Sequence, residues 1–250
     1  MVLFDKVTKI YEDGTKAVDH LDLKIERGEI AVLIPAYNAA HSLRGVIEGI
    51  KGFGLPIVVV DDGSTDSTAE IAKDTGVPIL RHRTNRGKGA ALQTGFRFLL
   101  QKGYRAIITF DADGQHDPAF IPHFIRAYEE EMGDIIIGSR AEEFDAMSWL
   151  RRFWNRLGVK AVSKLIGTPL TDTQSGYRLI KAEVVRGLPL RAAGYEGELE
   201  LLIKACKRGY RVVDIPIATR YADGRPSSHF RPVRDTWLVC RTFLQEFFWG

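Results

Sequence analysis

The sequence has little cysteine, with only Cys206 and Cys240 in a chain of 250 residues. So few cysteines exclude a disulfide framework and fit a reducing compartment. Long hydrophobic runs are also missing, because no segment approaches the ~18–20 apolar residues of a membrane-spanning helix. The opening residues MVLFDKVTKIYEDG contain acids and no apolar core, so they do not resemble a secretory signal. We expect a cytoplasmic protein, either soluble or peripheral on the cytoplasmic face of a membrane.

An excess of charge of one sign is lacking as well. Lysine and arginine total 35 and acidic residues 32, which leaves a net charge of +3. This balance does not indicate a polyanionic partner, and we expect no nucleic acid. Hydrophobic residues make up 45% of the chain, enough to bury the core of one large α/β domain, with or without appendages.

What the sequence does contain is a series of short apolar runs separated by helical patterns. IAVLI, PIVVV, VPIL, AIITF and DIIIGS are rich in valine and isoleucine, as strands buried on both faces are. Strand–helix alternation of this kind predicts right-handed crossovers and a mostly parallel sheet with helices on both faces. The expected helices lie at about 41–51, 66–74, 88–102 and 118–131.

Other patterns flank this alternation. Residues 2–11 and 17–26 alternate apolar and polar around EDGTK, which predicts a β-hairpin. Near the C-terminus we expect a helix at 199–208, a strand in YRVVDIPI and a last helix over 232–248. The chain then divides into an N-terminal hairpin extension over 1–29, an α/β domain over 30–232 and a C-terminal amphipathic helix over 233–250.

Three of the predicted strands end in polar motifs. IAVLI runs into PAYNAA, PIVVV into DDGSTDST, and AIITF into DADGQHDP. In an open parallel α/β sheet, ligands bind outside the carboxyl ends of the strands. We therefore expect these three motifs to converge on one crevice, although they lie far apart along the chain.

The motif DADGQHDP places two carboxylates one residue apart, at Asp111 and Asp113. Mg²⁺ and Mn²⁺ take oxygen ligands, and Mg²⁺ usually keeps one or two protein carboxylates while water and substrate phosphates complete its shell. Gln115 offers a neutral oxygen, whereas Asp117 followed by Pro118 fits a helix N-cap. A plain turn with a cap explains Asp117 but not the other two acids, so we favour a metal site on a diphosphate.

Two further motifs indicate a nucleotide, and each also has a simpler interpretation. Asp61 and Asp62 end a strand and could accept hydrogen bonds from a base and a ribose. NRGKGAAL, residues 85–92, enters a helix through a glycine-rich turn that resembles an anion cradle, although it is not the GxxxxGK[ST] of a P-loop. Lys88 in this motif is either a phosphate ligand or a solvated residue at the start of a helix.

These motifs together resemble glycosyltransferase family 2, of the GT-A fold, over the chain from Ile30 to about Asp235. The branch they resemble is that of the dolichyl- and polyprenyl-phosphate sugar transferases. PAYN, DDGSTD, NRGKGAAL, DADGQHDP, GSR, TDTQSGYRLI, GELELLIKA and IPIATRYADGRPSSHFRPVRD occur in the order typical of the family. The chain departs from the pattern at Ala39, where Glu is frequent, and at Ser67, where Gly is frequent.

The resemblance implies a metal-dependent, inverting transfer of a sugar from a GDP- or UDP-sugar donor to a lipid-linked acceptor, foremost a polyprenyl phosphate. It implies Mg²⁺ or Mn²⁺ on Asp111, Asp113 and Gln115. It implies that the nucleotide-sugar contacts Pro35, Ala36, Tyr37, Asp62, Lys88 and Asp111.

The resemblance also implies catalytic and acceptor-side residues. The expected catalytic residues are Asp113, Glu198 and Arg178, although Glu198 could equally be an acidic residue of a first helical turn. A lipid phosphate needs little help from a base, whereas a hydroxyl acceptor needs a positioned carboxylate. The residues expected at phosphates of the acceptor or donor are Arg140, Arg152, Ser175, Arg220 and Arg225, the arginines because a guanidinium grips phosphate oxygens with two hydrogen bonds.

Residues 146–166 and 234–249 combine tryptophan and phenylalanine with basic residues. This combination suits a membrane interface, and packing against the core is the alternative. Residues 1–29 resemble the opening hairpin of ABC transporter ATPases, but neither a Walker A motif nor an LSGGQ-like signature follows, so we expect no ATPase activity. We interpret them as a fused extension that pairs with a sheet edge or with a second subunit.

Three other functions stay open at this point: transfer to a glycan or glycolipid hydroxyl, synthesis of a nucleotide-activated product, and a catalytically silent nucleotide-sugar-binding or regulatory subunit. Intact Asp111, Asp113 and Arg178 argue against the silent subunit. A homo-oligomer also stays open.

Overall fold

Seven strands form one central sheet in a computed structural model, which describes residues 2–10, 16–25, 29–140, 159–160, 162–164, 167, 169–218 and 241–242. The strand order is β5-β4-β3-β6-β8-β7-β9. The strands are β3 (Ile30–Ala36), β4 (Ile57–Asp61), β5 (Ile79–Arg81), β6 (Ala106–Thr109), β7 (Ile135–Ser139), β8 (Arg178–Lys181) and β9 (Val212–Pro216).

Parallel pairing dominates this sheet, as predicted. β5, β4, β3 and β6 pair in parallel, and so do β7 and β9. β8 runs antiparallel to both of its neighbours, β6 and β7, and the sequence analysis did not include it. The carboxyl ends of β3, β4 and β6 therefore lie along one edge of the sheet.

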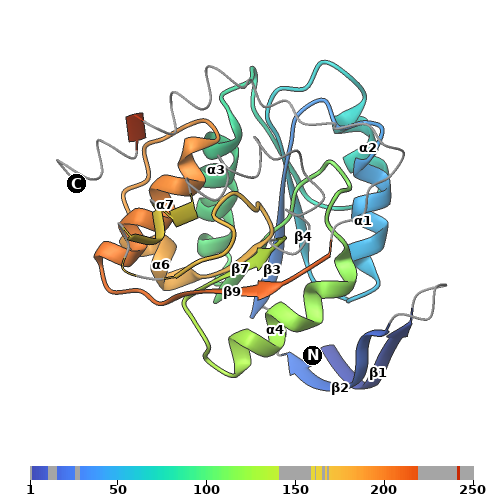
Figure 1. The fold of residues 1–250 in the computed structure, drawn as a ribbon. Coiled ribbons are helices and arrows are strands. Elements are labelled where there is room, and N and C mark those ends of the chain that lie inside the picture. The colour runs from blue at the N-terminus through green and yellow to red at the C-terminus, as the bar shows by residue number, and fades with distance from the viewer. Residues whose placement is uncertain are drawn as a thin grey trace, which may run out of the picture.

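Helices cover both faces of the sheet (Figure 1). One face buries a cluster that includes Ile47, Ala72 and Phe124, and the other buries Phe96, Val184 and Leu202. The helices of the first face are α1 (Leu43–Lys51), α2 (Thr68–Asp74) and α4 (Ile121–Glu129), the last preceded by the 3₁₀ turn η1 (Pro118–Phe120). Those of the second face are α3 (Lys88–Gln101), α6 (Ala182–Gly187) and α7 (Glu196–Lys207).

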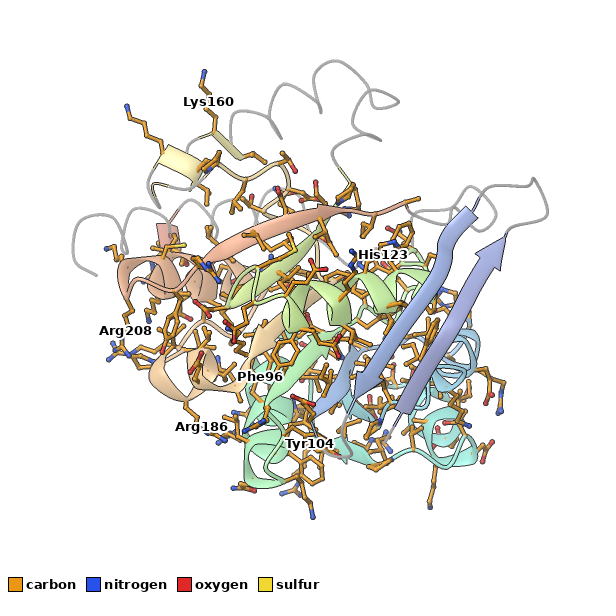
Figure 2. All side chains as sticks on the ribbon, turned by 90° about the horizontal axis from the view of Figure 1, so that it is seen from below. Phe96, Tyr104, His123, Lys160, Arg186 and Arg208 are labelled. Atoms are coloured by element: carbon orange, nitrogen blue, oxygen red, sulfur yellow. The ribbon has the colours of Figure 1, made fainter. Side chains whose placement is uncertain are left out.

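The N-terminal hairpin consists of β1 (Val2–Ile10) and β2 (Lys16–Ile25), which pair antiparallel in a two-stranded sheet of their own. Figure 2 shows this pair beside α4, the helix that carries His123, and β2 contacts that helix. The hairpin itself is thus confirmed, but within the described residues its strands do not pair with an edge of the central sheet.

Most of the two aromatic and basic segments, 146–166 and 234–249, lies outside the described residues, as do Arg152, Arg220 and Arg225. In the part of the chain that the structure covers, no helix is both long and apolar enough to cross a membrane.

Candidate active site

The three polar motifs meet at the carboxyl edge of the sheet, as predicted. Backbone amides of the loop after β3 donate to the loop after β4, from Asn38 to Ser64 Oγ at 2.9 Å and from Ala39 to Thr68 Oγ1 at 2.8 Å. Ser42 Oγ, from the same loop, donates to the Ala112 carbonyl at 2.6 Å. The first motif thus holds the backbone between the two metal-site candidates Asp111 and Asp113.

Lys88 joins two acids from distant parts of the chain. Its Nζ lies 2.7 Å from Asp111 Oδ1 and 3.0 Å from Glu198 Oε2. All three side chains are largely buried, with Lys88 16% exposed. Lys88 comes from the start of α3 and Glu198 from the first turn of α7, which begins one turn before its expected start. The structure therefore brings three predicted site residues into direct contact: Lys88 for the nucleotide-sugar, Asp111 for the metal and Glu198 for catalysis.

The opposite charges in this cluster keep Lys88 protonated and Asp111 ionised. Burial alone would lower the pKa of the Lys88 ammonium, but the Asp111 and Glu198 carboxylates outweigh it and hold that pKa above its ordinary value. Burial would likewise raise the pKa of Asp111, yet Lys88 and His116 keep it well below the usual range. His116 Nε2 lies 3.4 Å from Asp111 Oδ2. The lysine is therefore a fixed cation and Asp111 a fixed anion.

Asp113 differs from Asp111 because, within the described residues, neither Lys88 nor His116 forms an ion pair with it. Burial, and then the charge on Asp111, raise the pKa of Asp113 above its ordinary value. Asp113 Oδ1 accepts one hydrogen bond, from the Gln115 amide at 2.9 Å. Two half-buried carboxylates that repel each other fit a divalent cation, which would relieve the repulsion.

The residues that fit the metal are few. Asp111, Asp113 and Gln115 supply oxygen atoms, the donors that Mg²⁺ and Mn²⁺ prefer. Across the described residues, no three His, Cys, Asp or Glu side chains are grouped so that they could hold a metal ion.

The glycine-rich turn at 85–92 does not form the anion cradle that its sequence resembles. The amides of Gly89 and Ala90, in the first turn of α3, donate to the carbonyls of Gly194 and Ala193 at 3.1 and 2.9 Å. A Cβ on Gly89 would lie 2.5 Å from the Ala192 carbonyl oxygen, so glycine is needed for close backbone approach. The helix start is therefore capped by a neighbouring loop, which occupies the Gly89 and Ala90 amides, and the contact of Lys88 with a phosphate stays a prediction.

The two aspartates that end β4 are engaged within the protein. Asp61 Oδ2 lies 2.9 Å from Arg81 Nε, and its Oδ1 accepts from the Ser64 amide at 2.9 Å. Asp62 is 2% exposed, and its carboxylate contacts His82 and the 85–88 turn. Both side chains are buried and hydrogen-bonded within the protein, and the contact of Asp62 with the nucleotide-sugar stays a prediction. Pro35 and Ala36 are buried in β3, and Tyr37 just beyond them is half-buried.

Arg178 and Ser175 are also placed inside the protein. Arg178 is 1% exposed, and its three guanidinium nitrogens donate to the carbonyls of Ser175, Glu198 and Thr173 at 2.7, 3.0 and 3.0 Å. Ser175 Oγ accepts from the Tyr177 amide at 3.3 Å. Arg178 therefore ties the loop at 171–177 to the first turn of α7, where Glu198 lies.

Arg140, which follows β7, is paired with Asp172 of the 171–177 loop. Its Nε donates to Asp172 Oδ2 at 2.8 Å, while Asp172 Oδ1 accepts from the amides of Gln174 and Ser175 at 2.8 and 3.2 Å. Burial would raise the pKa of Asp172, but Arg140 and these amides hold it below its ordinary value. The Arg140 side chain is 23% exposed, so part of it faces solvent.

Several residues of the site were not predicted. Ser42, His82 and His116 lie on loops that follow strands. Because ligands bind outside the carboxyl ends of parallel strands, these loops could have been searched for further site residues. Glu200 is 3% exposed and accepts from the amides of Arg191 and Ala192 at 2.9 and 2.8 Å, so it fixes the loop that caps α3. No sequence signal separates Glu200 from an ordinary helical glutamate.

Solved structures share this architecture. Glucosyl-3-phosphoglycerate synthase of Mycobacterium tuberculosis, in a crystal structure with Mn²⁺, uridine diphosphate and phosphoglyceric acid, superposes with a TM-score of 0.69 at 20% identity. The match covers 88% of this chain and 78% of that one. The central sheet with its flanking helices thus has the GT-A fold.

The sequence defines the family more closely. The profile of glycosyl transferase family 2 matches residues 31–188, and the chain belongs to that family. It is 31% identical over 202 residues to an undecaprenyl-phosphate mannosyltransferase of Micrococcus luteus, covering 75% of this chain and 82% of the relative. It is 32% identical over 218 residues to a UDP-N-acetylglucosamine–dolichyl-phosphate N-acetylglucosaminyltransferase of Methanococcus voltae, covering 78% and 86%.

Proposed function

We propose that the protein is a metal-dependent, inverting glycosyltransferase that moves a sugar from a nucleotide-sugar to a polyprenyl phosphate. The observation that carries the proposal is the Asp111–Lys88–Glu198 bridge beside Asp113, at the edge of the sheet where the nucleotide-sugar is expected. The acceptor is inferred from the two relatives, whose names specify undecaprenyl phosphate and dolichyl phosphate. The donor class is a GDP- or UDP-sugar.

In an inverting transfer, the acceptor oxygen attacks the anomeric carbon in line with the departing nucleoside diphosphate. Asp111, Asp113 and Gln115 would hold Mg²⁺ or Mn²⁺, which when bound supplies positive charge to the diphosphate. Lys88 provides a second positive charge at the same place, held in position before substrate arrives. We propose that Tyr37, next to the buried Pro35 and Ala36, contacts the nucleotide of the donor.

Glu198 Oε2 forms an ion pair with Lys88 Nζ at 3.0 Å, and this pairing favours a phosphate acceptor. A phosphate oxygen is anionic and attacks without losing a proton, so the reaction does not need Glu198 as a free base. Glu198 then serves catalysis by holding the lysine. We propose that Arg140 binds the acceptor phosphate. We propose the same role for Arg152, Arg220 and Arg225 from the sequence alone, because they lie outside the described residues.

A polyprenyl chain lies in a membrane, so the enzyme must work at its surface. We propose that residues 146–166 and 234–249 make that contact on the cytoplasmic face through their aromatic and basic side chains.

The test is transfer from radiolabelled GDP- and UDP-sugars to undecaprenyl phosphate in detergent, with Mn²⁺, with Mg²⁺ and with EDTA. We expect EDTA to abolish transfer and Asp113→Asn to reduce it by about 10³-fold, because several kcal/mol of charge stabilisation are lost. Asp134→Asn is the control: Asp134 also has a half-buried carboxylate, paired with Lys181 at 2.9 Å at the opposite end of β7. Full activity in EDTA, or in Asp113→Asn, would refute the metal-dependent mechanism.

A further inference from the structure

We propose that Asp62 is a positioning residue, which holds the 85–88 turn so that Lys88 stands between Asp111 and Glu198. The inference rests on the proposed function and departs from direct nucleotide binding by Asp62.

One carboxylate holds two successive amides of this turn. Asp62 Oδ1 accepts from the Arg86 amide at 3.0 Å, and Oδ2 accepts from the Gly87 amide at 2.7 Å. Hydrogen bonds to a buried charged acceptor are about twice as strong as those between neutral groups. With Asp62 2% exposed, these contacts fix the backbone immediately before Lys88.

A second link runs from the same carboxylate to the body of α3. Asp62 Oδ1 lies 2.6 Å from His82 Nδ1, and His82 Nε2 lies 2.9 Å from Thr94 Oγ1. His82 is buried, and Thr94 lies on the helix that Lys88 begins. Asp62 is therefore connected to α3 at two places, before its first residue and further along the helix.

The turn is confined on its other side as well. Gly87 has a φ of +98°, and a Cβ there would lie 2.4 Å from the Ala193 carbonyl oxygen. The turn is thus held between Asp62 and the 192–194 loop, and Lys88 follows directly. A shift of about 1 Å in a positioned group costs up to ~10²-fold in rate. Loss of the Asp62 contacts with this turn should therefore slow the reaction.

Asp61 provides a matched control. It is as buried as Asp62 and lies next to it, but its partners are Arg81 and Ser64 rather than the 85–88 turn. Asp61→Asn should therefore resemble Asp62→Asn in destabilising the end of β4, without releasing Lys88.

The first experiment reads the position of Lys88 without any substrate. The purified full chain and its Asp62→Asn and Asp61→Asn variants are acylated with a limiting amine reagent, and Lys88 modification is followed by peptide mass spectrometry. We expect Asp62→Asn to raise the rate at Lys88 by about tenfold through local opening, and Asp61→Asn to leave it unchanged. An unchanged rate in Asp62→Asn, with the thermal transition retained, would overturn the proposal.

The second experiment asks whether Asp62 acts through Lys88. Affinity for UDP and for GDP with Mn²⁺ is measured by calorimetry in the wild type, Asp62→Asn, Lys88→Met and the double variant. If Asp62 acts through Lys88, each single change weakens the nucleotide by about tenfold, and Asp62→Asn adds nothing once Lys88 is removed. Additive losses would mean direct contact and would overturn the proposal. If neither nucleotide binds the wild type, the proposed function fails, while the acylation result still decides the role of Asp62.

Discussion

At the scale of single residues, the site depends on one lysine shared by two acids. Lys88 places one positive charge between the carboxylates of Asp111 and Glu198, so each acid influences the other through it. Asp113 lies outside this compensation, and its pKa is raised by burial and by the charge on Asp111. The cluster therefore has three carboxyl groups and one ammonium, which leaves two carboxyl groups in excess at the place where the metal is proposed.

Changing Glu198 to Gln should separate the two kinds of acceptor. For a phosphate acceptor, Glu198→Gln keeps an oxygen facing Lys88, and we expect transfer to fall by less than about tenfold. A hydroxyl acceptor needs the carboxylate as a base, and its loss costs about 10²–10⁴-fold. The measurement is the steady-state rate with undecaprenyl phosphate.

Glu196→Gln is the control for this change. Glu196 lies in the same first turn of α7, but its Oε1 accepts from the Gly194 amide at 3.1 Å instead of contacting Lys88. A loss beyond about 10²-fold in Glu198→Gln alone would contradict a phosphate acceptor that needs no base.

At the scale of elements, α3 and α7 approach each other through glycine. Gly89 has no room for a side chain, since its Cβ would lie 2.5 Å from one carbonyl oxygen and 2.8 Å from another. Both oxygens belong to the backbone of the loop before α7, at Ala192 and Gly194. This close approach brings the starts of the two helices, and with them Lys88 and Glu198, together.

Gly89→Ala should therefore destabilise the protein by about 1–3 kcal/mol, because a backbone must move to accept the methyl group. Gly45→Ala should do the opposite. Gly45 is exposed in α1, and a Cβ there would have nothing within 4 Å, so alanine should stabilise the helix by about 0.5–1 kcal/mol. Urea denaturation measures the change in the free energy of unfolding for both variants. A change of the same sign in Gly89→Ala and Gly45→Ala would contradict the tight contact at α3.

The elements that the sequence predicted are those with a local signal. The valine- and isoleucine-rich runs of β3, β4, β6 and β7 identified buried strands, and the rule for carboxyl ends then located the metal motif. β8 escaped because RLIK has two apolar residues between two cations and resembles a loop. In the structure it pairs with β6 and β7, and the buried Arg178 side chain donates to three backbone carbonyls that the fold brings together.

The same reasoning applies to two of the expected site motifs. Asp62 and the glycine-rich turn both have the composition of a nucleotide site, and composition does not show which partners a fold supplies. Here the partners of Asp62 are His82 and two amides, and those of the α3 amides are the 193–194 carbonyls. Contacts between residues far apart along the chain lie beyond what local patterns reveal.

At the scale of the whole molecule, the Arg140–Asp172 pair connects the end of β7 to the loop at 171–177. The pKa of Asp172 is below its ordinary value, since Arg140 and the loop amides outweigh burial. The pair therefore stabilises the fold above about pH 4, where an unfolded Asp is ionised, and this contribution is lost as the pH falls through the folded-state pKa.

Asp172→Asn should lower the free energy of unfolding by about 1–3 kcal/mol at neutral pH, a value discounted for the partial exposure of Arg140. Its stability should also depend less on pH below about pH 4 than that of the wild type. Urea denaturation across a pH series measures both. Glu48→Gln, which breaks an exposed pair with Lys51, should change stability by less than about 0.5 kcal/mol, and parallel pH curves for wild type and Asp172→Asn would contradict the assignment.

The position of β8 in the sheet has a consequence for biosynthesis. A ribosome completes β6 and β7 well before it reaches residue 178, yet β8 must enter between them. Until then β6 has an unpaired side, and such an open strand edge recruits other chains. The nascent protein is therefore most prone to aggregate between the synthesis of β7 and that of β8, and a chaperone that covers the bare edge of β6 would protect it during this interval.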